Sequence, residues 1–463
     1  MRKNIGWIVI FIVVTQFFSI SFAKNEITVE DLGKEISIKT RLANYVMDKE
    51  YGTFKQVYLT FDRGRKNLIY EYAGDGFDIL KNGKRLKVKR ITLMNREDLN
   101  GIFTGDVSIT FDYGDLKKTI IFEYGPYYSY RIKVRCATEG LKMSLPRVGF
   151  SENDRIGGDF FISYYSKTKT IQITIADEPV KISTENEVVE IMLKDDLELL
   201  NYMGPVKFTL MKKLIGEKYQ EIKSALDTLP KIKSWYDPIF YGFVEFLSFF
   251  YRITGNYGWA IIIFTIIVRL ILYPLYHIQT KSMIKMRMIQ PKVEEIKKKF
   301  KDPQIQQQEL MKLYKEEKMN PASGCLPLLI QMPIFILLFA VIRYYKESFA
   351  FSPPFLIWPD LSVGGFKENI LLVIIDVIIS FYNALISSND KRSARQSVIM
   401  GTVFPFLFIS FPVALFLYYT VGSVIQFGAT YYVHRRYNIK GITVKEFFGL
   451  EDKKKKKRKK RKR

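Results

Sequence analysis

The feature that most constrains this chain is a run of 36 uncharged residues over 398–433. A helix of that length would be about 54 Å long, which exceeds the roughly 30 Å hydrocarbon core of a membrane. Phe411-Pro412 lies near the middle of the run, and proline ends a helix because it lacks the backbone donor that a continuing helix needs. The run therefore predicts two membrane spans, 398–411 and 412–433, joined by a tight turn.

Four further apolar segments are long enough to cross a membrane as helices. They comprise residues 1–23, 257–276, 321–342 and 370–386. The first starts with Arg2-Lys3 and continues as an uncharged run, which predicts an N-terminal transmembrane signal anchor. Cleavage of this segment stays open, because Ser21-Phe22-Ala23 has the small residues that a signal peptidase accepts. The sequence thus predicts six spans.

Positive charges between the spans orient them in the membrane. Three links are rich in Lys and Arg, namely residues 277–320, 387–397 and 434–463. The first holds 11 basic and 6 acidic residues, and the last holds 15 basic and 3 acidic residues, so these links account for most of the net charge of +24. Because positively charged links face the cytoplasm, six spans place both chain ends there and the loop 343–369 outside.

Residues 24–230 alternate apolar and polar side chains with the period of two that half-buried strands show. Three stretches follow this pattern closely: 107–111, 130–134 and 171–175. Gly114-Asp115, between two such runs, is typical of a hairpin turn. We therefore predict a periplasmic all-β sandwich inserted between the anchor and a five-span core, which makes the chain a polytopic α-helical membrane protein with one β domain.

The end of this domain and the segment that follows it are expected to be helical. Residues 214–229 form a helix-like connection, and an aromatic stripe over 231–256 predicts an amphipathic helix in the membrane interface, unless it forms the first turns of a longer span. The domain contains no His and one Cys. A scaffold or interaction role is therefore favoured over catalysis, although Asp and Glu chemistry stays open.

Motifs for nucleotide or metal chemistry are absent from the sequence. There is no G-x-x-x-x-G-K-[ST] loop and no H-E-x-x-H pair. Cys136 and Cys325 cannot form a disulfide framework, and His277 and His434 are too few and too far apart in sequence to suggest a zinc site. We expect no cofactor, no metal ion and no enzymatic reaction.

The second span contains a charged residue, Arg269, about 10 Å from the predicted cytoplasmic end of its helix. A buried arginine costs about 3 kcal/mol on insertion scales, so it usually faces protein or water; snorkelling to the headgroups is the alternative. Residues on the predicted spans that would line a wet groove with it are Thr265, Gln331, Met332, Asn383, Thr420 and Gln426. Asp376 lies at a similar depth, which makes an ion pair with Arg269 one interpretation.

The link 277–320 has the pattern of a helical hairpin. One apolar stripe repeats at steps of three and four residues and consists of Met283, Met286, Ile289, Val293, Ile296 and Phe300. Lys301-Asp302-Pro303 interrupts it before a second stripe that contains Leu310, Leu313 and Tyr314. A methionine-rich stripe can dock apolar segments of varied sequence, and it can equally pack against its partner helix; both interpretations stay open.

The chain ends in eleven consecutive basic residues. They are Lys453, Lys454, Lys455, Lys456, Lys457, Arg458, Lys459, Lys460, Arg461, Lys462 and Arg463. Such a run repels itself and binds polyanions, of which ribosomal RNA and anionic lipid are the two candidates on the cytoplasmic side.

Four motifs occur in order along the second half of the chain. They are Tyr257-Gly258-Trp259-Ala260 with Arg269 and Tyr273-Pro274-Leu275; residues 286–292; residues 320–335; and Phe411-Pro412 with Leu415 and Leu417-Tyr418-Tyr419. Together they resemble the YidC membrane protein insertase family over about residues 235–440. The anchor and the outer domain resemble Gram-negative-type members by architecture only. Pro412-Val413-Ala414-Leu415 departs from the Pro-Ser-Gly-Leu of many members, and Asp376 is not part of the family pattern.

The resemblance implies a protein of the bacterial inner membrane that inserts and folds nascent membrane proteins, alone or with the Sec translocon. It implies five core spans around a hydrophilic groove that is open to cytoplasm and lipid, with Arg269 as the arginine of the groove. It also implies that the protein works as a monomer or with the translocon. Two rivals stay open: a secondary transporter, which should show inverted repeats, and a membrane-anchored β-sandwich enzyme, which needs a catalytic cluster in 24–230.

Overall fold

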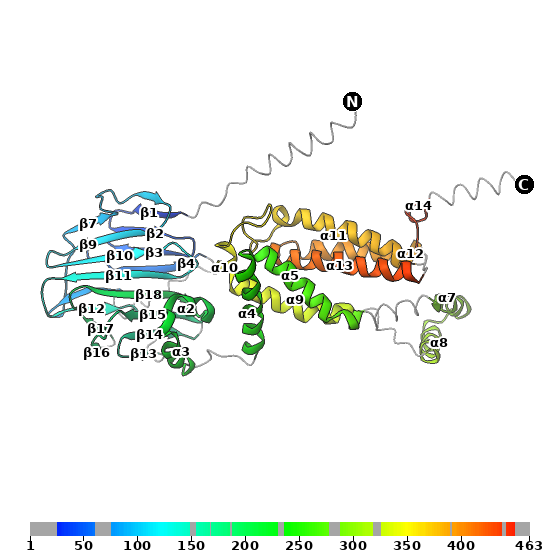
Figure 1. Cartoon of the computed structure of the whole chain (residues 1–463), viewed down its shortest axis with the longest axis horizontal. Helices are drawn as coiled ribbons and strands as arrows, with labels where there is room; N and C mark the ends of the chain where they lie inside the picture. Colours follow the sequence, from blue (N-terminus) through cyan, green and yellow to red (C-terminus); the bar gives the residue numbers. More distant parts are fainter. Residues whose placement is uncertain are drawn as a thin grey trace, which may run out of the picture. The chain divides into compact units, whose positions relative to one another are not determined.

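The structure is a computed structural model, and it divides the chain into two compact units, Met1–Asp237 and Pro238–Arg463 (Figure 1). We call them the β unit and the helical unit. The anchor 1–23, Met283, Met286 and the basic tail 453–463 lie outside the residues that the structure describes. The described residues are 26–60, 76–148, 154–166, 168–185, 188–229, 236–276, 288–317, 326–388, 391–437 and 441–449.

Three antiparallel sheets build the β unit. Their strand orders are β4-β3-β2-β1-β8, β13-β14-β15-β18-β11-β10-β9-β7 and β16-β17-β12-β5-β6. The strands are β1 (Ile27–Asp31), β2 (Glu35–Lys39), β3 (Ala43–Asp48), β4 (Phe54–Leu59), β5 (Ile79–Lys81), β6 (Lys84–Arg85), β7 (Arg90–Leu93), β8 (Gly101–Phe103), β9 (Val107–Asp112), β10 (Leu116–Phe122), β11 (Ser129–Cys136), β12 (Leu141–Leu145), β13 (Arg155–Ile156), β14 (Phe160–Tyr165), β15 (Thr170–Ala176), β16 (Ile182–Glu185), β17 (Val188–Met192) and β18 (Leu197–Pro205).

The predicted all-β domain is confirmed, and the period of two matches the burial of β9 and β11, whereas every residue of β15 is buried. In β9 every second residue from Val107 is buried, and β10 pairs with it antiparallel across the turn that contains Gly114. Gly114 has φ +98, a conformation that L side chains rarely adopt. Aromatic rings then join the sheet that contains β3 to the eight-stranded sheet, because the ring centre of Tyr45 of β3 lies 5.0 Å from that of Phe122 of β10 and 5.5 Å from that of Tyr130 of β11.

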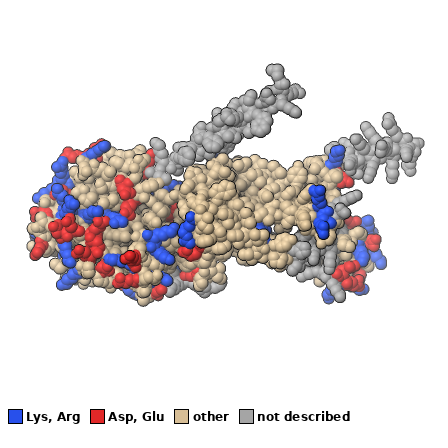
Figure 2. All heavy atoms as spheres, viewed as in Figure 1, with Lys and Arg blue, Asp and Glu red and all other residues tan. Residues whose placement is uncertain are grey.

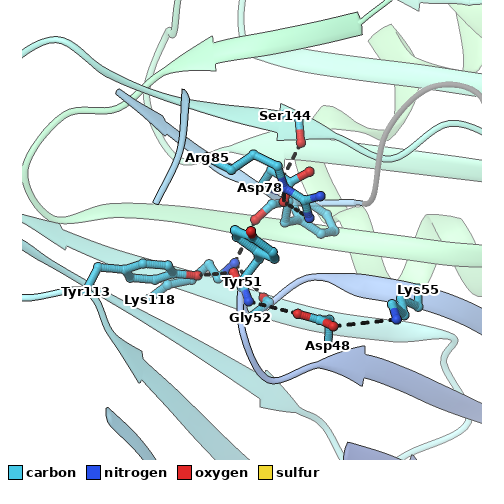
Figure 3. A network of polar contacts seen from close by, with 10 residues as sticks. Asp48, Tyr51, Gly52, Lys55, Asp78, Arg85, Tyr113, Lys118 and Ser144 are labelled. Atoms are coloured by element: carbon cyan, nitrogen blue, oxygen red, sulfur yellow. Dashed lines mark hydrogen bonds and ion pairs between the residues drawn. The ribbon is translucent and has the colours of Figure 1, made fainter. Parts of the chain in front are cut away.

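A charged side chain, Lys118 of β10, lies in the core of the β unit at 0% exposure (Figure 3). Its Nζ donates hydrogen bonds of 2.7 Å to the carbonyl oxygens of Gly52 and Phe77. Burial lowers the pKa of Lys118 to about 7; the nearby carboxylate of Asp78 opposes this effect, and the guanidinium of Arg85 adds to it. Asp78 and Arg85 pair with each other at 2.6 Å. The network therefore ties β10 to the turn after β3 and to the segment before β5.

The helix expected over 214–229 is broken into two pieces. Helix α2 spans Phe208–Ile215 and α3 spans Tyr219–Asp227, with a short 3-10 turn, η3 (Gly216–Lys218), between them. Gly216 has φ +64, so the chain changes direction there. One stripe of α3 is buried, which indicates that it packs as an amphipathic helix.

The helical unit contains the apolar segments. Its helices are α4 (Asp237–Thr254), α5 (Tyr257–Ile271), α7 (Gln290–Lys299), α8 (Pro303–Glu316), α9 (Leu326–Tyr344), α10 (Lys346–Ala350), α11 (Phe366–Ser387), α12 (Lys391–Leu407), α13 (Val413–Arg436) and α14 (Val444–Phe447). Helices α11 and α13 are long and apolar enough to cross a membrane, while Tyr257–Ile271 and Gln331–Tyr344 are shorter apolar stretches. Figure 2 shows charges spread over the β unit and a largely uncharged face on these helices.

Helix α11 packs against both α12 and α13, and α5 and α9 pack against α13. The turn predicted at Phe411-Pro412 is present, because α12 ends at Leu407 and Pro412 caps α13. Asn369 of α11 fixes this turn by donating to the carbonyl oxygens of Ile409 and Phe411 at 2.8 and 2.7 Å. The loop predicted over 387–397 is mostly helical, since α12 starts at Lys391; a helix can continue past the apolar residues into a polar surrounding.

Candidate functional site

The site around Arg269 depends on how α5 is held. Asn256 caps the helix by accepting from the backbone N–H of Gly258 at 2.8 Å, and its Nδ2 donates to the carbonyl oxygens of Pro353 and Pro354, both at 3.0 Å. Arg269 follows in the last turn of α5, where a cation is favoured by the helix dipole. The Asn256 side chain thus fixes the start of the helix that carries Arg269.

The Arg269 guanidinium is surrounded by neutral groups. Its Nη1 donates to the hydroxyl of Tyr276 at 2.7 Å, and its Cζ lies 5.2 Å from the centre of the same ring. The group also lies close to Gly422 of α13, where a Cβ would be 2.3 Å from Nη2. Its Nε is buried without an acceptor among the described residues. No carboxylate in the described part of the chain forms an ion pair with Arg269, and its described contacts are with neutral groups.

A second polar contact lies on α13 one turn away from Gly422. Gln331 of α9 donates from Nε2 to the hydroxyl of Tyr418 at 2.7 Å. The Tyr418 ring lies 6.1 Å from that of Phe264, which belongs to α5. Together with the Arg269 contact, this joins α5 and α9 to the same helix through hydrogen-bonding groups that an apolar interface would lack.

The structure brings together only some of the residues that the sequence assigned to the groove. Thr265 is fully buried and donates to the carbonyl oxygen of Ile261 in its own helix at 2.6 Å. Met332 and Gln426 are half-buried. Asn383 has a buried Oδ1 for which no described residue supplies a donor. Arg269 and Gln331 are thus the two groove candidates whose side chains contact α13 on the α5 and α9 side.

Thr420 belongs to a different contact. Its Oγ1 donates to Oδ2 of Asp376 at 2.8 Å, and Asp376 is 2% exposed. Thr420 and Gly422 lie about 200° apart around a helix with 3.6 residues per turn. Asp376 and Arg269 therefore contact different sides of α13. No ion pair joins them in the structure as far as it is described, so that prediction is wrong.

A cap formed by residues 345–365 covers one end of the helices. Tyr257 stacks on Phe349 with ring centres 4.3 Å apart, and Phe355 packs so closely on Gly258 that a Cβ there would lie 2.0 Å from the ring. The start of α13 is joined to the cap by a backbone hydrogen bond of 2.8 Å from Ala414 to Leu361. Buried aromatic rings and paired backbone groups thus close this end of the bundle.

The described part of the 277–320 link is a hairpin with a core of its own. Ile289 and Val293 pack with Leu313, and the partly buried members of the cluster are Ile296, Leu310 and Tyr314. Asp302 caps α8 by accepting from the N–H of Gln304 at 2.8 Å. The described stripe therefore packs against its partner helix, which is one of the two interpretations that the sequence left open; Phe300, after α7, is half-buried.

Comparison with known proteins identifies the family. The chain is 43% identical to the membrane protein insertase YidC of Thermotoga maritima over 439 residues, which is 93% of this chain and 96% of that protein. It belongs to the YidC membrane protein insertase family. The family described as "60Kd inner membrane protein" matches residues 249–440. The resemblance seen in the sequence motifs is thereby confirmed, and these relatives are named as insertases and not as enzymes.

Other YidC proteins and structures agree. The YidC of Geobacter sp. strain M21 is 34% identical over 237 residues, which cover 50% of this chain and 42% of that protein. A crystal structure of an active YidC insertase with its first transmembrane domain resolved has a TM-score of 0.79 and 42% identity, and the match covers 92% of this chain and 98% of that one. The YidC of Thermotoga maritima gives a TM-score of 0.66 at 34% identity, with 88% and 99% covered.

Three residues of the site were not singled out from the YidC-like sequence. The sequence patterns placed Tyr276 at the end of a predicted span and Tyr418 in one of the family motifs. They gave no role to Gly422. A signal existed for Tyr276, because it follows Arg269 by seven residues, or two helical turns, and so lies on the same side of the chain. No sequence pattern indicates that Gly422 lies against the guanidinium, since that contact depends on how α5 and α13 pack.

Proposed function

We propose that the chain inserts membrane proteins into a bacterial inner membrane by offering polar segments a hydrated path beside Arg269. The observation that carries this proposal is an arginine in an apolar helix whose described partners are all neutral. An arginine that served only to hold helices together would be expected to pair with an acid, and Asp376 is bonded to Thr420 instead.

Solvation explains why such a site helps insertion. A polar segment that enters hydrocarbon loses the water on its backbone and charges, at a cost of several kilocalories per mole for each unsatisfied group. A wetted groove that reaches part of the way shortens this passage, and the Arg269 cation attracts acidic residues of the incoming segment. The apolar part of the substrate moves between helices into lipid, because burying its side chains is favourable. No nucleotide is required.

The proposal assigns a topology to the chain. Residues 1–23 anchor it, the β unit lies in the periplasm, and five further spans form the core with both termini in the cytoplasm. Arg269 and Gln331 line the groove in this proposal, with Met332, Asn383 and Gln426 as further candidates. Thr265 is buried and bonded within α5, and Thr420 is bonded to Asp376 on another side of α13. Support comes from the positive links of the sequence and from the apolar helices of the helical unit.

The partners follow from charge and from the reaction. Nascent membrane proteins are the substrates, and the Sec translocon is the companion for those that need it. The ribosome and anionic lipids compete for the basic tail over 453–463, because a run of eleven cations binds polyanions of either kind. Contacts of this type weaken steeply as salt rises, which distinguishes them from apolar contacts.

The test compares two substitutions at one position in an insertion assay with paired substrates. The substrates differ only in whether the translocated segment carries acidic or neutral residues. We expect Arg269→Ala to impair the acidic substrate selectively and Arg269→Lys to be largely tolerated, since attraction needs a charge and not a planar fork. Arg343→Ala is the matched control, because Arg343 is an exposed arginine in the last turn of α9.

Two results would contradict the proposal. Equal loss for both substrates would remove the charge attraction, even if Arg269 proved essential. A mild effect of Arg269→Ala for every substrate, about a kilocalorie per mole in stability, is what a snorkelling arginine gives.

A further inference from the structure

Gly422, in the middle of α13, lies close to Arg269. A Cβ built on Gly422 would lie 2.3 Å from Nη2 and 3.0 Å from both Cζ and Nε of Arg269. These three atoms belong to the guanidinium, so a side chain at 422 would compete with this group for the same space. Tyr276 contacts the same group through a hydrogen bond from Nη1 and through its ring.

The glycine is not required by its backbone. Gly422 lies within a regular helix, and it is not among the residues with positive φ in the described part of the chain. Glycine inside a helix costs about 1 kcal/mol relative to alanine, so its presence needs a compensating contact. Gly428 of the same helix offers a comparison, because a Cβ there would meet no atom within 4 Å.

We propose that Gly422 is a positioning residue for Arg269: the absence of a side chain at 422 fixes where the guanidinium stands and toward which side its free N–H groups point. This inference rests on the proposed function, since it specifies how the attracting cation is placed. Tyr276 restrains the group through Nη1, and the bare backbone at Gly422 leaves room for Nη2, Cζ and Nε. The buried Nε, which has no described acceptor, is a consequence of this placement.

A methyl group at 422 displaces the guanidinium without unfolding the helix. The atoms that it meets are the far end of a flexible side chain, which moves at little cost, while alanine itself favours the helix. A shift of about 1 Å changes a charge separation from roughly 4 to 5 Å. At an effective dielectric constant near 20, this weakens the attraction to an acid about fourfold in equilibrium terms.

The experiment is a double-mutant cycle between positions 422 and 269 in the full-length protein. Insertion of the acidic and neutral substrates is measured for the wild type, Gly422→Ala, Arg269→Lys and the double variant, with Gly428→Ala as the control. We expect Gly422→Ala to lower insertion of the acidic substrate about fourfold and to leave the neutral one unchanged. In the Arg269→Lys background the same substitution should have no effect, because an ammonium group has no Nη2 to displace.

Each outcome decides one question. If Gly422→Ala lowers insertion of both substrates equally, with Arg269 and with Lys at position 269, then Gly422 only packs the helix and the inference fails. If Gly422→Ala matches Gly428→Ala while Arg269→Ala still discriminates between substrates, the inference fails and the proposed function stands. If the two positions are coupled but neither affects the acidic substrate selectively, Gly422 places Arg269 while the charge attraction is refuted.

Discussion

Replacing Lys118 with Met should make the stability of the β unit less dependent on pH. The wild-type amine has a pKa near 10.5 in the unfolded chain and about 7 in the folded one. The unfolded chain therefore binds more protons between these values, so the contribution of Lys118 to stability is fully present above pH 10.5 and is lost as the pH falls through 7. Methionine has a similar shape and does not titrate.

The magnitude follows from the two pKa values. The difference between 10.5 and about 7 corresponds to roughly 5 kcal/mol at 1.36 kcal/mol per pH unit. Between pH 9.5 and pH 6, Lys118 should lower the free energy of unfolding by about 3 kcal/mol of this total. At high pH the variant should be less stable, because the carbonyl oxygens of Gly52 and Phe77 lose their donor, at about 1–3 kcal/mol each. At pH 6 the free energy of unfolding of the wild type should thus exceed that of Lys118→Met by less than at pH 9.5, or fall below it.

Cys136 reports unfolding of this unit in the full-length protein. It is buried, and once Cys325→Ser removes the other thiol it is the only one left in the chain. Urea midpoints are read from a short pulse of thiol reagent at pH 6 and pH 9.5. Lys117→Met is the control, because Lys117 is 60% exposed on the same strand. A difference between wild type and Lys118→Met that stays constant over this pH range would refute the reasoning.

Three other predictions concern the tail and the helices. Removing 453–463 should weaken ribosome binding and leave membrane integration intact; cosedimentation that is insensitive to salt in the intact protein would contradict this. Asn369→Ala should lower stability in detergent by about 2 kcal/mol, because two carbonyl oxygens of the turn after α12 lose their donor; an unchanged denaturation midpoint would show that other contacts hold the turn. Leu313→Ala should cost roughly 2–5 kcal/mol within the hairpin and speed its cleavage in limited proteolysis, whereas cleavage at the wild-type rate would mean that the cluster does not hold it together.

The β unit was predictable because its strands carry their own pattern. Alternation located β9, β11 and β15, although β15 is buried along its whole length and not half-buried. Gly114 located the turn of the β9–β10 hairpin. The same pattern contained the signal for Lys118, which shares its parity with the buried Leu116 and Ile120 of β10. A lysine on the core side was not singled out because long charged side chains are rarely buried without a pairing acid.

The contacts around α13 were not predictable from one sequence. Counting residues from helix ends gives the depth of a side chain but not the direction in which it points around the helix axis. Asp376 and Arg269 have similar depths, and the packing of α11 and α5 on different sides of α13 keeps them apart. The start of α12 was missed for a related reason, since hydropathy marks where apolar residues begin and not where helical hydrogen bonds begin.

The cap formed by residues 345–365 has a consequence for the leakage of ions across the membrane. A helix bundle that contains a cation and several polar groups could conduct ions if it were open at both ends. Protons and metal ions would then leak down their gradients across the membrane. Packed rings and paired backbone at one end leave little room for water there, and an ion that crosses such a region pays the cost of losing its hydration. The same rings and backbone bonds that hold α5 and α13 together would then also oppose the leak of ions.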